Sequence, residues 1–459
     1  MRSAIKCLVA VCAMYSAVPS DAQDWESFGL RNYFLEVKQV YADTLHNDLY
    51  VVGSTNWTQD MGISFYRYHD GDWDTIGLFD QNLDNIINWN DTLVVCGPFF
   101  SVNGDSLRRI ACKVANQWLP FGQVTGSGVS RFKVINGELY ALGGGGPGAA
   151  IDGQPWSGIA KRVGGHWEPL PLMVGLTDAG IRDITYYQGR LVAVGNIHFE
   201  GDPYRDVMIL NEDSTWSPIG EQGLYGLAAY GSRCLVYQGD LYVVGGFSRS
   251  AGNAGHEIMR WDGNEWHDVG GGLTWTPDNF SMACTGTWME EHDGLLFVSS
   301  GCNYAGNVPA GGIATWDGQR WCGLGDPLPG GCMSFAFLND TLYANAIQWN
   351  TNNYPNDVVR FVGDSWSDTC SVPVGVNDLR MPEARFSAWL SASNELTVTG
   401  LDQGSQDLGI VDLAGRSLWR IRVTPSPQGT VTTPWPAEVP SGFYGITLRG
   451  RGAVKLFQP

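Results

Sequence analysis

Aromatic side chains recur along the chain in polar stretches that each follow a short apolar run. A flat ring beside amide and carboxylate groups can stack on a sugar ring, while the polar groups fix the orientation of the sugar by hydrogen bonds. The alternative is that these aromatic residues only cover the ends of packed sheets. We expect a glycan or protein ligand to contact the following residues: Trp57, Phe99, Trp156, Phe199, Tyr204, Phe247, Tyr304 and Trp349.

The histidines and carboxylates show no spacing that identifies a metal or catalytic site. The seven His occur singly and no Cys-x-x-Cys pair is present, so we expect no metal, no cofactor and no assigned catalytic residue. Asp70–Asp74 alternates carboxylates as a calcium loop does, but Gln81 stands where a bidentate Glu is required. A hairpin turn with solvated acids is the better interpretation of that segment.

Tryptophans at nearly constant spacing identify the elements that must position the aromatic residues. Successive tryptophans of this series lie 45 to 55 residues apart in the sequence. A period of this size indicates one supersecondary unit that is repeated. The series consists of Trp25, Trp73, Trp118, Trp167, Trp216, Trp266, Trp321 and Trp366.

Each unit has the pattern of four short strands. The second strand is almost continuously apolar, as in Leu241–Gly245, which favours burial on both faces. The third, as in Ile258–Trp261, is followed by an Asp-Gly or Gly-Gly turn, and the series tryptophan opens the fourth. Four antiparallel strands in about 40–50 residues predict a propeller blade. We therefore predict an all-β chain with a seven-bladed β-propeller over residues 23–372, in preference to a β-solenoid, with Trp25 in a strand that closes the ring.

The units resemble those of kelch-type and galactose-oxidase central-domain propellers. The resemblance rests on Leu241–Gly246, on the aromatic-Asp-Gly turn at 261–263 and on Trp266 three residues later. Several units lack the glycine pair of the kelch pattern, for example at Gly97-Pro98. The resemblance implies a fold and not an activity. A copper site of two His, two Tyr and a Cys can be neither built nor excluded from the spacing. A binding module that uses the loop face is the leading hypothesis, and a secreted hydrolase or oxidase with its active site on that face is the alternative.

The repeat ends after Cys370, and a different pattern follows. Residues 373–384 have the composition of a linker, and residues 385–459 alternate as the short strands of a small C-terminal β-sandwich do. This tail resembles the C-terminal sorting domain of the type IX secretion system of Bacteroidetes, on the segments 394–398, 412–416, 439–444 and 454–457. An unrelated terminal sandwich is the alternative. The resemblance implies recognition by the secretion machinery through Asp412, Gly415, Arg416, Pro440, Gly442, Tyr444 and Lys455.

The N-terminus predicts export. Residues 1–22 combine Arg2 and Lys6, a short apolar stretch, and small residues at Ser20 and Ala22, which is typical of a cleavable signal peptide. The apolar stretch is too short to span a membrane, and no later segment is long and apolar enough to do so. We expect a secreted or cell-surface protein that passes through the periplasm. The net charge of −19 argues against nucleic acid or an anionic membrane as a partner.

The cysteines predict disulfides. Removal of residues 1–22 leaves eight cysteines, an even number in an exported chain. We expect pairing within single units, because neighbouring strands bring nearby cysteines together. The expected pairs are Cys96–Cys112, Cys284–Cys302 and Cys322–Cys332, which leaves Cys234 and Cys370 by default.

Overall fold

The computed structural model forms two compact units, Met1–Cys370 and Ser371–Pro459, which we describe separately. The described residues are 24–30, 34–55, 63–107, 109–201, 205–220, 223–225, 229–275, 284–325, 328, 331–346, 357–363, 366, 369–370, 387–391, 394–401, 404–411, 417–437, 439–440, 442–448 and 453–458. The expected signal peptide and the expected linker at 373–384 lie outside these residues. Within the described part of the chain, no helix is long and apolar enough to cross a membrane.

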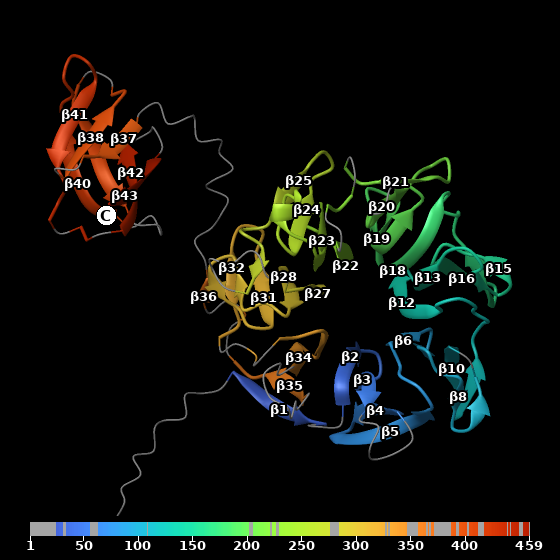
Figure 1. Cartoon of the computed structure of the whole chain (residues 1–459). Helices are drawn as coiled ribbons and strands as arrows, with labels where there is room; N and C mark the ends of the chain where they lie inside the picture. Colours follow the sequence, from blue (N-terminus) through green and yellow to red (C-terminus); the bar gives the residue numbers. More distant parts are fainter. Residues whose placement is uncertain are drawn as a thin grey trace, which may run out of the picture. The chain divides into compact units, whose positions relative to one another are not determined.

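The first unit is built of antiparallel sheets arranged in a ring, which is a propeller-like architecture (Figure 1). Within the described residues the sheet pairing yields seven sets of four strands. From the innermost strand outward, the first three are β2 (Phe34–Asp43), β3 (Asp48–Thr55), β4 (Ile63–His69) and β5 (Asp72–Phe79); β6 (Asn85–Trp89), β7 (Thr92–Cys96), β10 (Ile110–Val114) and β11 (Gln117–Pro120); and β12 (Val129–Ile135), β13 (Glu138–Gly145), β16 (Ile159–Val163) and β17 (His166–Pro169).

The remaining four sets continue around the ring in chain order. They are β18 (Leu176–Tyr187), β19 (Arg190–Phe199), β20 (Val207–Leu210) and β21 (Trp216–Pro218); β22 (Tyr230–Tyr237), β23 (Asp240–Gly246), β24 (Ile258–Trp261) and β25 (Trp266–Asp268); β27 (Gly286–His292), β28 (Leu295–Ser300), β31 (Ile313–Trp316) and β32 (Trp321–Gly323); and β33 (Phe335–Leu338), β34 (Thr341–Ala346), β35 (Asp357–Phe361) and β1 (Trp25–Gly29).

The last of these sheets is completed from the N-terminal end of the described chain. Strand β1 pairs antiparallel with β35, with Trp25 opposite Phe361 and Glu26 opposite Arg360. The ring of sheets is therefore closed by hydrogen bonds between the two ends of the unit. This confirms the prediction that Trp25 lies in a closing strand, and it explains why Trp25 precedes the first repeat.

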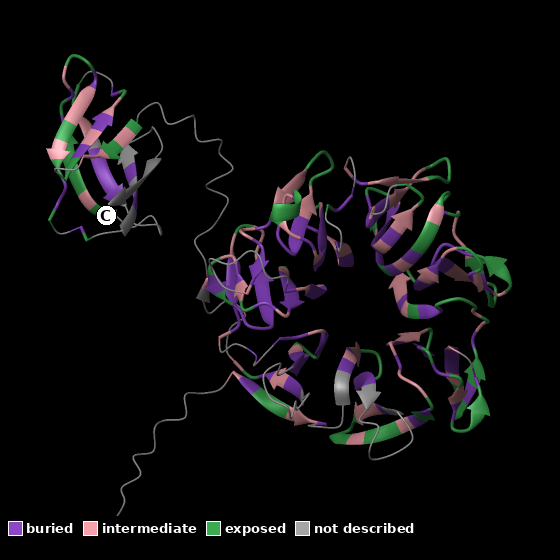
Figure 2. Cartoon of the chain, in the orientation of Figure 1, coloured by how far each residue is buried: buried purple, intermediate pink, exposed green. Residues whose placement is uncertain are grey.

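The series tryptophans connect neighbouring sheets. In six of them the indole N–H donates to a backbone carbonyl at the outer edge of the preceding sheet, so each ring lies in the seam between two sheets. The bonds run from Trp73 to Phe28 (3.0 Å), Trp118 to Ile76 (3.3 Å), Trp167 to Phe121 (2.8 Å), Trp216 to Pro171 (2.8 Å), Trp266 to Ile219 (3.3 Å) and Trp321 to Val269 (2.9 Å). Figure 2 shows the inner strands of the sheets as largely buried and the outer strands and turns as more exposed.

Within the described residues, three of the loops between second and third strands contain a small hairpin. These are β8 (Ser101–Val102) with β9 (Asp105–Ser106), β14 (Ala150–Ile151) with β15 (Gln154–Pro155), and β29 (Tyr304–Ala305) with β30 (Val308–Pro309). Each hairpin pairs backward: β8 with β5, Ile151 with Val124, and β29 with β26 (Leu273–Thr274). Another such loop carries a short 3-10 turn, η1 (Arg249–Ala251). The loops thus cover the preceding sheet.

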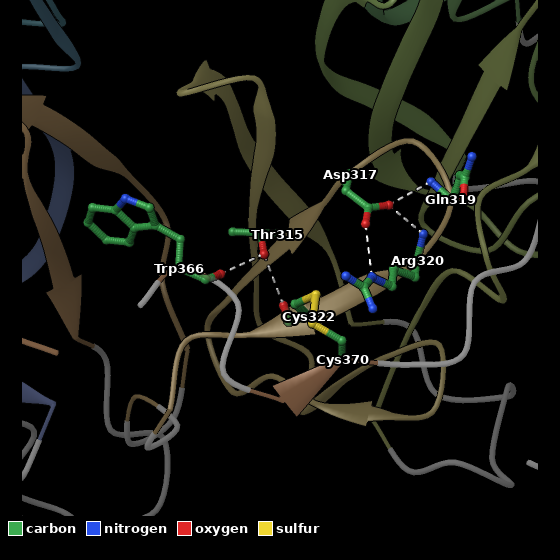
Figure 3. Close-up of a disulfide and its surroundings, with 7 residues drawn as sticks. All are labelled: Thr315, Asp317, Gln319, Arg320, Cys322, Trp366 and Cys370. Carbon is green, nitrogen blue, oxygen red and sulfur yellow. Dashed lines mark hydrogen bonds and ion pairs between the residues drawn. A yellow bond between two sulfur atoms is a disulfide. The ribbon is translucent and has the colours of Figure 1, made fainter. Parts of the chain in front are cut away.

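The disulfide pattern differs in part from the expected one. Cys284–Cys302 is formed as predicted, but Cys322 bonds to Cys370 and not to Cys332 (Figure 3). Strand β36 (Thr369–Cys370) pairs beside β32 with Cys370 directly opposite Cys322, which the spacing within one repeat could not indicate. The expected pair Cys322–Cys332 is therefore wrong, and Cys370, which was left without an expected partner, is the partner of Cys322.

The expected pair Cys96–Cys112 is also wrong. Although β7 and β10 are neighbours, Cys96 lies opposite Ile110 and Cys112 lies opposite Val94, so the two thiols are diagonal and belong to different cross-strand pairs. Among the described residues four cysteines are free and buried: Cys96, Cys112, Cys234 and Cys332.

The second unit consists of two antiparallel sheets that share one apolar core. One contains β37 (Ser387–Leu390), β38 (Glu395–Thr399) and β41 (Thr430–Pro434); the other contains β39 (Gln406–Val411), β40 (Ser417–Val423), β42 (Gly442–Leu448) and β43 (Ala453–Gln458). Leu396 and Val398 of the first sheet and Leu408, Ile410 and Ile446 of the second belong to the same buried cluster.

Of the residues expected to carry the sorting signal, four lie in the described part. Pro440 is exposed, and its carbonyl accepts a 2.6 Å hydrogen bond from the buried Tyr444 hydroxyl. Gly442 opens β42 and Lys455 lies within β43. Asp412, Gly415 and Arg416 lie outside the described residues.

Candidate functional site

The loop aromatics predicted to bind a ligand fall into three groups. Phe99, Trp156 and Phe247 are buried, with 0%, 1% and 4% of their surface exposed. Phe199 and Tyr304 are half-buried. The predicted site residues Trp57, Tyr204 and Trp349 lie outside the described part of the chain.

The three buried rings are not available to a ligand in this structure. Phe99 lies at the base of the β8–β9 hairpin, and its ring centroid is 5.1 Å from that of Phe79 in the preceding sheet. Trp156 packs in the same cluster as Ile151 and Phe132. Because the loops fold back on the preceding sheet, their aromatic residues fill the seams between sheets. Phe99, Trp156 and Phe247 therefore have the alternative role, in which aromatic residues cover packed sheets and do not stack on a ligand.

A different set of residues surrounds the centre of the ring of sheets. In each sheet we compare the residue that lies four positions before the last residue of the innermost strand. In the seventh sheet this residue comes directly before the first residue of β33. In five sheets this residue directly follows a β-bulge, at positions 38, 130, 182, 232 and 287, which changes the direction of the side chain. We call these seven residues the axial ring: Gln39, Asn85, Arg131, Asp183, Arg233, Trp288 and Ser334.

Four members of the axial ring join their sheet to the next one. In each, a side-chain oxygen accepts a hydrogen bond from the backbone N–H that follows the next sheet's axial residue. The bonds run from Ile86 to Gln39 (2.8 Å), Phe132 to Asn85 (2.8 Å), Cys234 to Asp183 (3.2 Å) and Val40 to Ser334 (3.1 Å). These bonds are the regular device by which the innermost strands are held together, including across the closure between β33 and β2.

Arg131, Arg233 and Trp288 depart from this pattern. A guanidinium or indole group has no acceptor for a backbone N–H, so these three residues cannot form the link. They meet one another instead: the Cζ atoms of Arg131 and Arg233 each lie 4.4 Å from the centroid of the Trp288 ring. Residues that break a local rule of the fold without stabilising it are candidates for function.

The three residues border a cavity of ≈ 500 Å³, a size suited to a small ligand. Its wall includes Gly128, just before the innermost strand β12, and Gly144 and Asn196 near the ends of the second strands β13 and β19. These points lie at the end of the sheets where the second-to-third loops begin. We call this space the axial cavity. It therefore lies at the end of the unit where the sequence predicted binding.

The axial cavity is richer in cations than the rest of the chain. Within the described residues its wall carries four cationic side chains, Lys38, Arg131, Arg182 and Arg233, and two carboxylates, Asp84 and Asp178, whereas the whole chain has a net charge of −19. A local reversal of charge in a concave site attracts anionic ligands.

The arginines of the axial ring are incompletely compensated. Asp183 is 3.1 Å from Lys133 Nζ and 3.9 Å from Arg131 Nε, and these cations lower the pKa of its buried carboxyl against the effect of burial. Burial and repulsion from Arg131 hold the pKa of Arg233 well below its usual range. The Nε atoms of Arg131 and Arg233 are buried with no hydrogen-bond partner within the described residues.

A second carboxyl group, that of Glu290, lies on β27 two residues after Trp288. Burial raises the pKa of Glu290 to about 7, while a hydrogen bond from Trp288 and the charge of Lys133 oppose the shift. Lys133 thus lies near one carboxyl that is ionised and another that titrates near neutrality. Two carboxyl groups with separated pKa values are an arrangement that acid–base catalysis uses.

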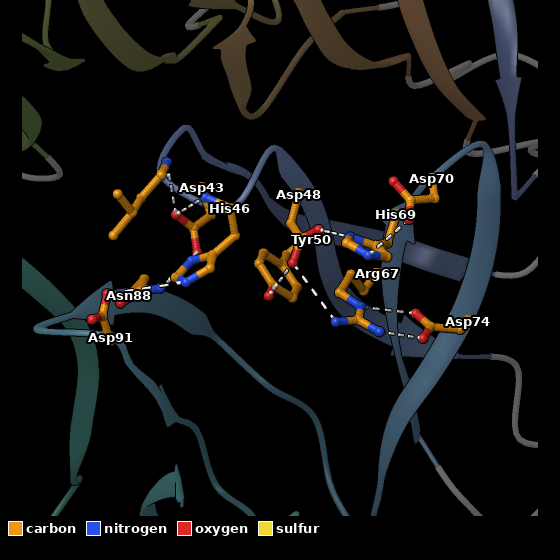
Figure 4. A network of polar contacts seen from close by, with 11 residues as sticks. Asp43, His46, Asp48, Tyr50, Arg67, His69, Asp70, Asp74, Asn88 and Asp91 are labelled. Atoms are coloured by element: carbon orange, nitrogen blue, oxygen red, sulfur yellow. Dashed lines mark hydrogen bonds and ion pairs between the residues drawn. The ribbon is translucent and has the colours of Figure 1, made fainter. Parts of the chain in front are cut away.

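Two other polar clusters lie away from the axial cavity. At the turns of β2–β5 the Asp48 carboxylate accepts hydrogen bonds from Tyr50 (3.0 Å) and lies 2.5 Å from His69 Nδ1, with Arg67 3.7 Å away (Figure 4). These contacts fasten neighbouring strands.

The other cluster is on the β24–β25 turn, where ligand atoms of Asp262, Glu265 and His267 lie within 4.8 Å of one another. The sequence position of His267 suggested an isolated histidine, but in the structure two carboxylates lie beside it. Its Nε2 is 2.7 Å from Asp262, whose second oxygen accepts the backbone N–H groups of Asn264 and Glu265.

Comparisons with known proteins give no family. No family model matches the chain, and no curated protein matches it. Similar solved structures include the extracellular domain of the candidate hybrid two-component system BT4673 from B. thetaiotaomicron (11% identity, TM-score 0.37), of which the chain covers 57% while 95% of the chain is matched.

Two further similar structures are enzymes. They are a Trypanosoma rangeli sialidase (11% identity, 94% of this chain and 90% of that chain, TM-score 0.35) and a GH74 xyloglucanase from Xanthomonas campestris (11% identity, 91% and 69%, TM-score 0.34). Likenesses this distant carry no argument about the activity of this chain.

The sequence contained a signal for the axial ring that repeat analysis alone did not use. Aligning the seven first strands by their turns would have placed Arg131, Arg233 and Trp288 in positions held elsewhere by Gln, Asn, Asp or Ser. Their contact across the centre depends on which strands face the axis, and that follows only from the closed ring.

Proposed function

We propose that the chain is an exported binding protein: a closed propeller of seven kelch-like blades that takes a ligand at its loop-bearing end, followed by a small sandwich that addresses it to the type IX secretion machinery. The observation that carries the binding function is the axial cavity, where Arg131, Arg233 and Trp288 replace the links between innermost strands. A glycan is the favoured ligand, since half-buried Phe199, the last residue of β19, and half-buried Tyr304, in the loop after β28, lie at the same end of their sheets.

Binding is tested with the full chain on an array of glycans. The wild type should bind a defined subset of glycans, and Trp57→Ala or Trp349→Ala should weaken that binding while leaving the melting temperature nearly unchanged. Wild-type protein that binds no glycan on the array but binds a protein ligand would overturn the choice of glycan. Protein that binds neither would overturn the binding function.

A secreted hydrolase is the second candidate, and Glu290 is the observation that favours it. Its pKa of about 7 suits a general acid, and Asp183 nearby is held ionised. The matching experiment is hydrolysis of chromogenic glycosides by the wild type and by Glu290→Gln. Turnover that is lost in the variant would establish the hydrolase, and absence of turnover in the wild type would count against it.

A further inference from the structure

We propose that the axial cavity binds an oxyanion, a carboxylate or phosphate group on a small ligand or on the end of a glycan, through the guanidinium groups of Arg131 and Arg233. The inference rests on the proposed function in that it assigns a ligand chemistry to the same cavity. Three observations carry it.

The first observation is the unused hydrogen-bonding capacity of the two arginines. A guanidinium group has five N–H donors, and a planar oxyanion can accept two of them side by side. Arg233 Nη1 donates to the Ser232 carbonyl, but Nε of Arg233 and Nε of Arg131 have no hydrogen-bond partner within the described residues. Buried donors of this kind cost free energy unless a ligand satisfies them.

The second observation is the shortage of negative charge at these groups. Asp183 is the carboxylate nearest to Arg131, and it is already engaged by Lys133 Nζ at 3.1 Å and by the Cys234 N–H at 3.2 Å. No ion pair joins Arg233 to a carboxylate in the described part of the chain. Two buried cations near one shared carboxylate leave a positive site that an anion would neutralise.

The third observation is that the two arginines are held in place before a ligand arrives. Both guanidinium groups lie against the ring of Trp288, itself only 8% exposed, and these cation–π contacts fix their positions on the third and fifth sheets of the ring. Arg182, whose Cζ is 4.4 Å from the Tyr230 ring centroid, adds a third cation to the same wall. Groups positioned in this way lose little conformational freedom on binding.

The test is a calorimetric titration of the full chain with three probes: sodium glucuronate, inorganic phosphate and, as the neutral twin of glucuronate, glucose. Wild-type protein should bind at least one of the two anions and should not bind glucose. Arg131→Met and Arg233→Met should each weaken binding at least about tenfold, because a bidentate ion-paired contact is lost. The matched control is Arg320→Met, the same change at an exposed turn, and it should bind as the wild type does.

The melting temperature of the Arg233→Met variant provides a second readout, because a ligand-binding role and a purely structural role of Arg233 predict different changes in it. Removing an unpaired buried charge should leave the melting temperature of Arg233→Met unchanged or higher, whereas loss of a structural contact would lower it. If Arg233→Met fails to fold, Arg233→Lys keeps the charge without the planar fork and should bind the anion more weakly than wild type.

The outcomes separate this proposal from the proposed function. Wild-type protein that binds neither glucuronate nor phosphate, or an Arg233→Met variant that binds them undiminished, overturns the oxyanion site. Glycan binding confined to neutral sugars and unaffected by Arg233→Met overturns it too and leaves the binding function standing. Anion binding without any glycan or protein ligand supports the oxyanion site and overturns the choice of a glycan or protein as the ligand.

Discussion

At the scale of single residues, the position that precedes the third strand is unusually constrained in the five sheets where the structure describes it. The carbonyl of this residue accepts a hydrogen bond from the end of the second strand, and the residue is Arg109, Gly158, Asp206, Glu257 or Gly312 in successive sheets. Glu257 has a φ of +61° and none of its surface is exposed. Gly158, at the same position two sheets earlier, has a φ of +90°. A non-glycine residue in this conformation and a buried acid are both costly.

This cost predicts an unusual pH dependence at Glu257. Burial raises the pKa of Glu257 to about 9, so between about pH 4.5 and 9 the folded chain holds a proton that the unfolded chain releases. Its contribution to stability is therefore greatest below about pH 4.5 and falls as the pH rises through this window. Glu257→Gln, which cannot ionise, should melt higher than the wild type at pH 8, with the difference shrinking toward pH 5.

The control for this measurement is Glu265→Gln, the same change at an exposed site on the next turn. It should shift the melting temperature little at either pH. A Glu257→Gln effect of equal size at pH 5 and pH 8 would contradict the assignment of a buried, protonated acid.

At the scale of elements, strand β36 is held to the ring of sheets by the Cys322–Cys370 disulfide and by its pairing with β32. Disulfides that close loops of this length typically stabilise by about 2–4 kcal/mol. Cys370→Ser should therefore lower the melting temperature, and Cys332→Ser should leave the disulfide intact.

Alkylation under denaturing conditions checks the pairing itself. Without reductant, mass spectrometry should find Cys96, Cys112, Cys234 and Cys332 modified and the other four cysteines of residues 23–459 protected. Modification of Cys370 together with protection of Cys332 would restore the pairing expected from the sequence.

Elements also show what the sequence could and could not predict. The tryptophan period located the strands and the closing role of Trp25, because six of the series indoles form the same hydrogen bond between neighbouring sheets. Cys284–Cys302 was predictable since both cysteines belong to one unit. Cys322–Cys370 and the burial of Phe99 and Trp156 were not, because they depend on where a loop or terminal strand folds back, and turn composition does not encode that direction.

At the scale of the whole molecule, the two units have separate apolar cores. Among the strands that the structure describes, none from the C-terminal unit belongs to the ring of sheets, so removing that unit should not unfold the ring. Deletion of residues 380–459 should yield a protein whose first unit melts at the same temperature as it does in the full-length chain. The truncated protein should stay in the periplasm. Surface display of the truncated protein, measured by protease accessibility on whole cells, would show that the tail is not the export address.

The closure of the ring by β1 has a consequence for how the chain reaches its native state. Trp25 and its partner Phe361 are separated by nearly the whole first unit, so the seventh sheet cannot be completed until that length of chain has left the ribosome or the translocation channel. Because β1 is made first and β35 last, β1 waits without its partner strand, and the edge of β35 can accept the β1 of another copy when copies are close together. Refolding at high protein concentration should therefore yield dimers that have exchanged β1, and dilution before refolding should yield monomers.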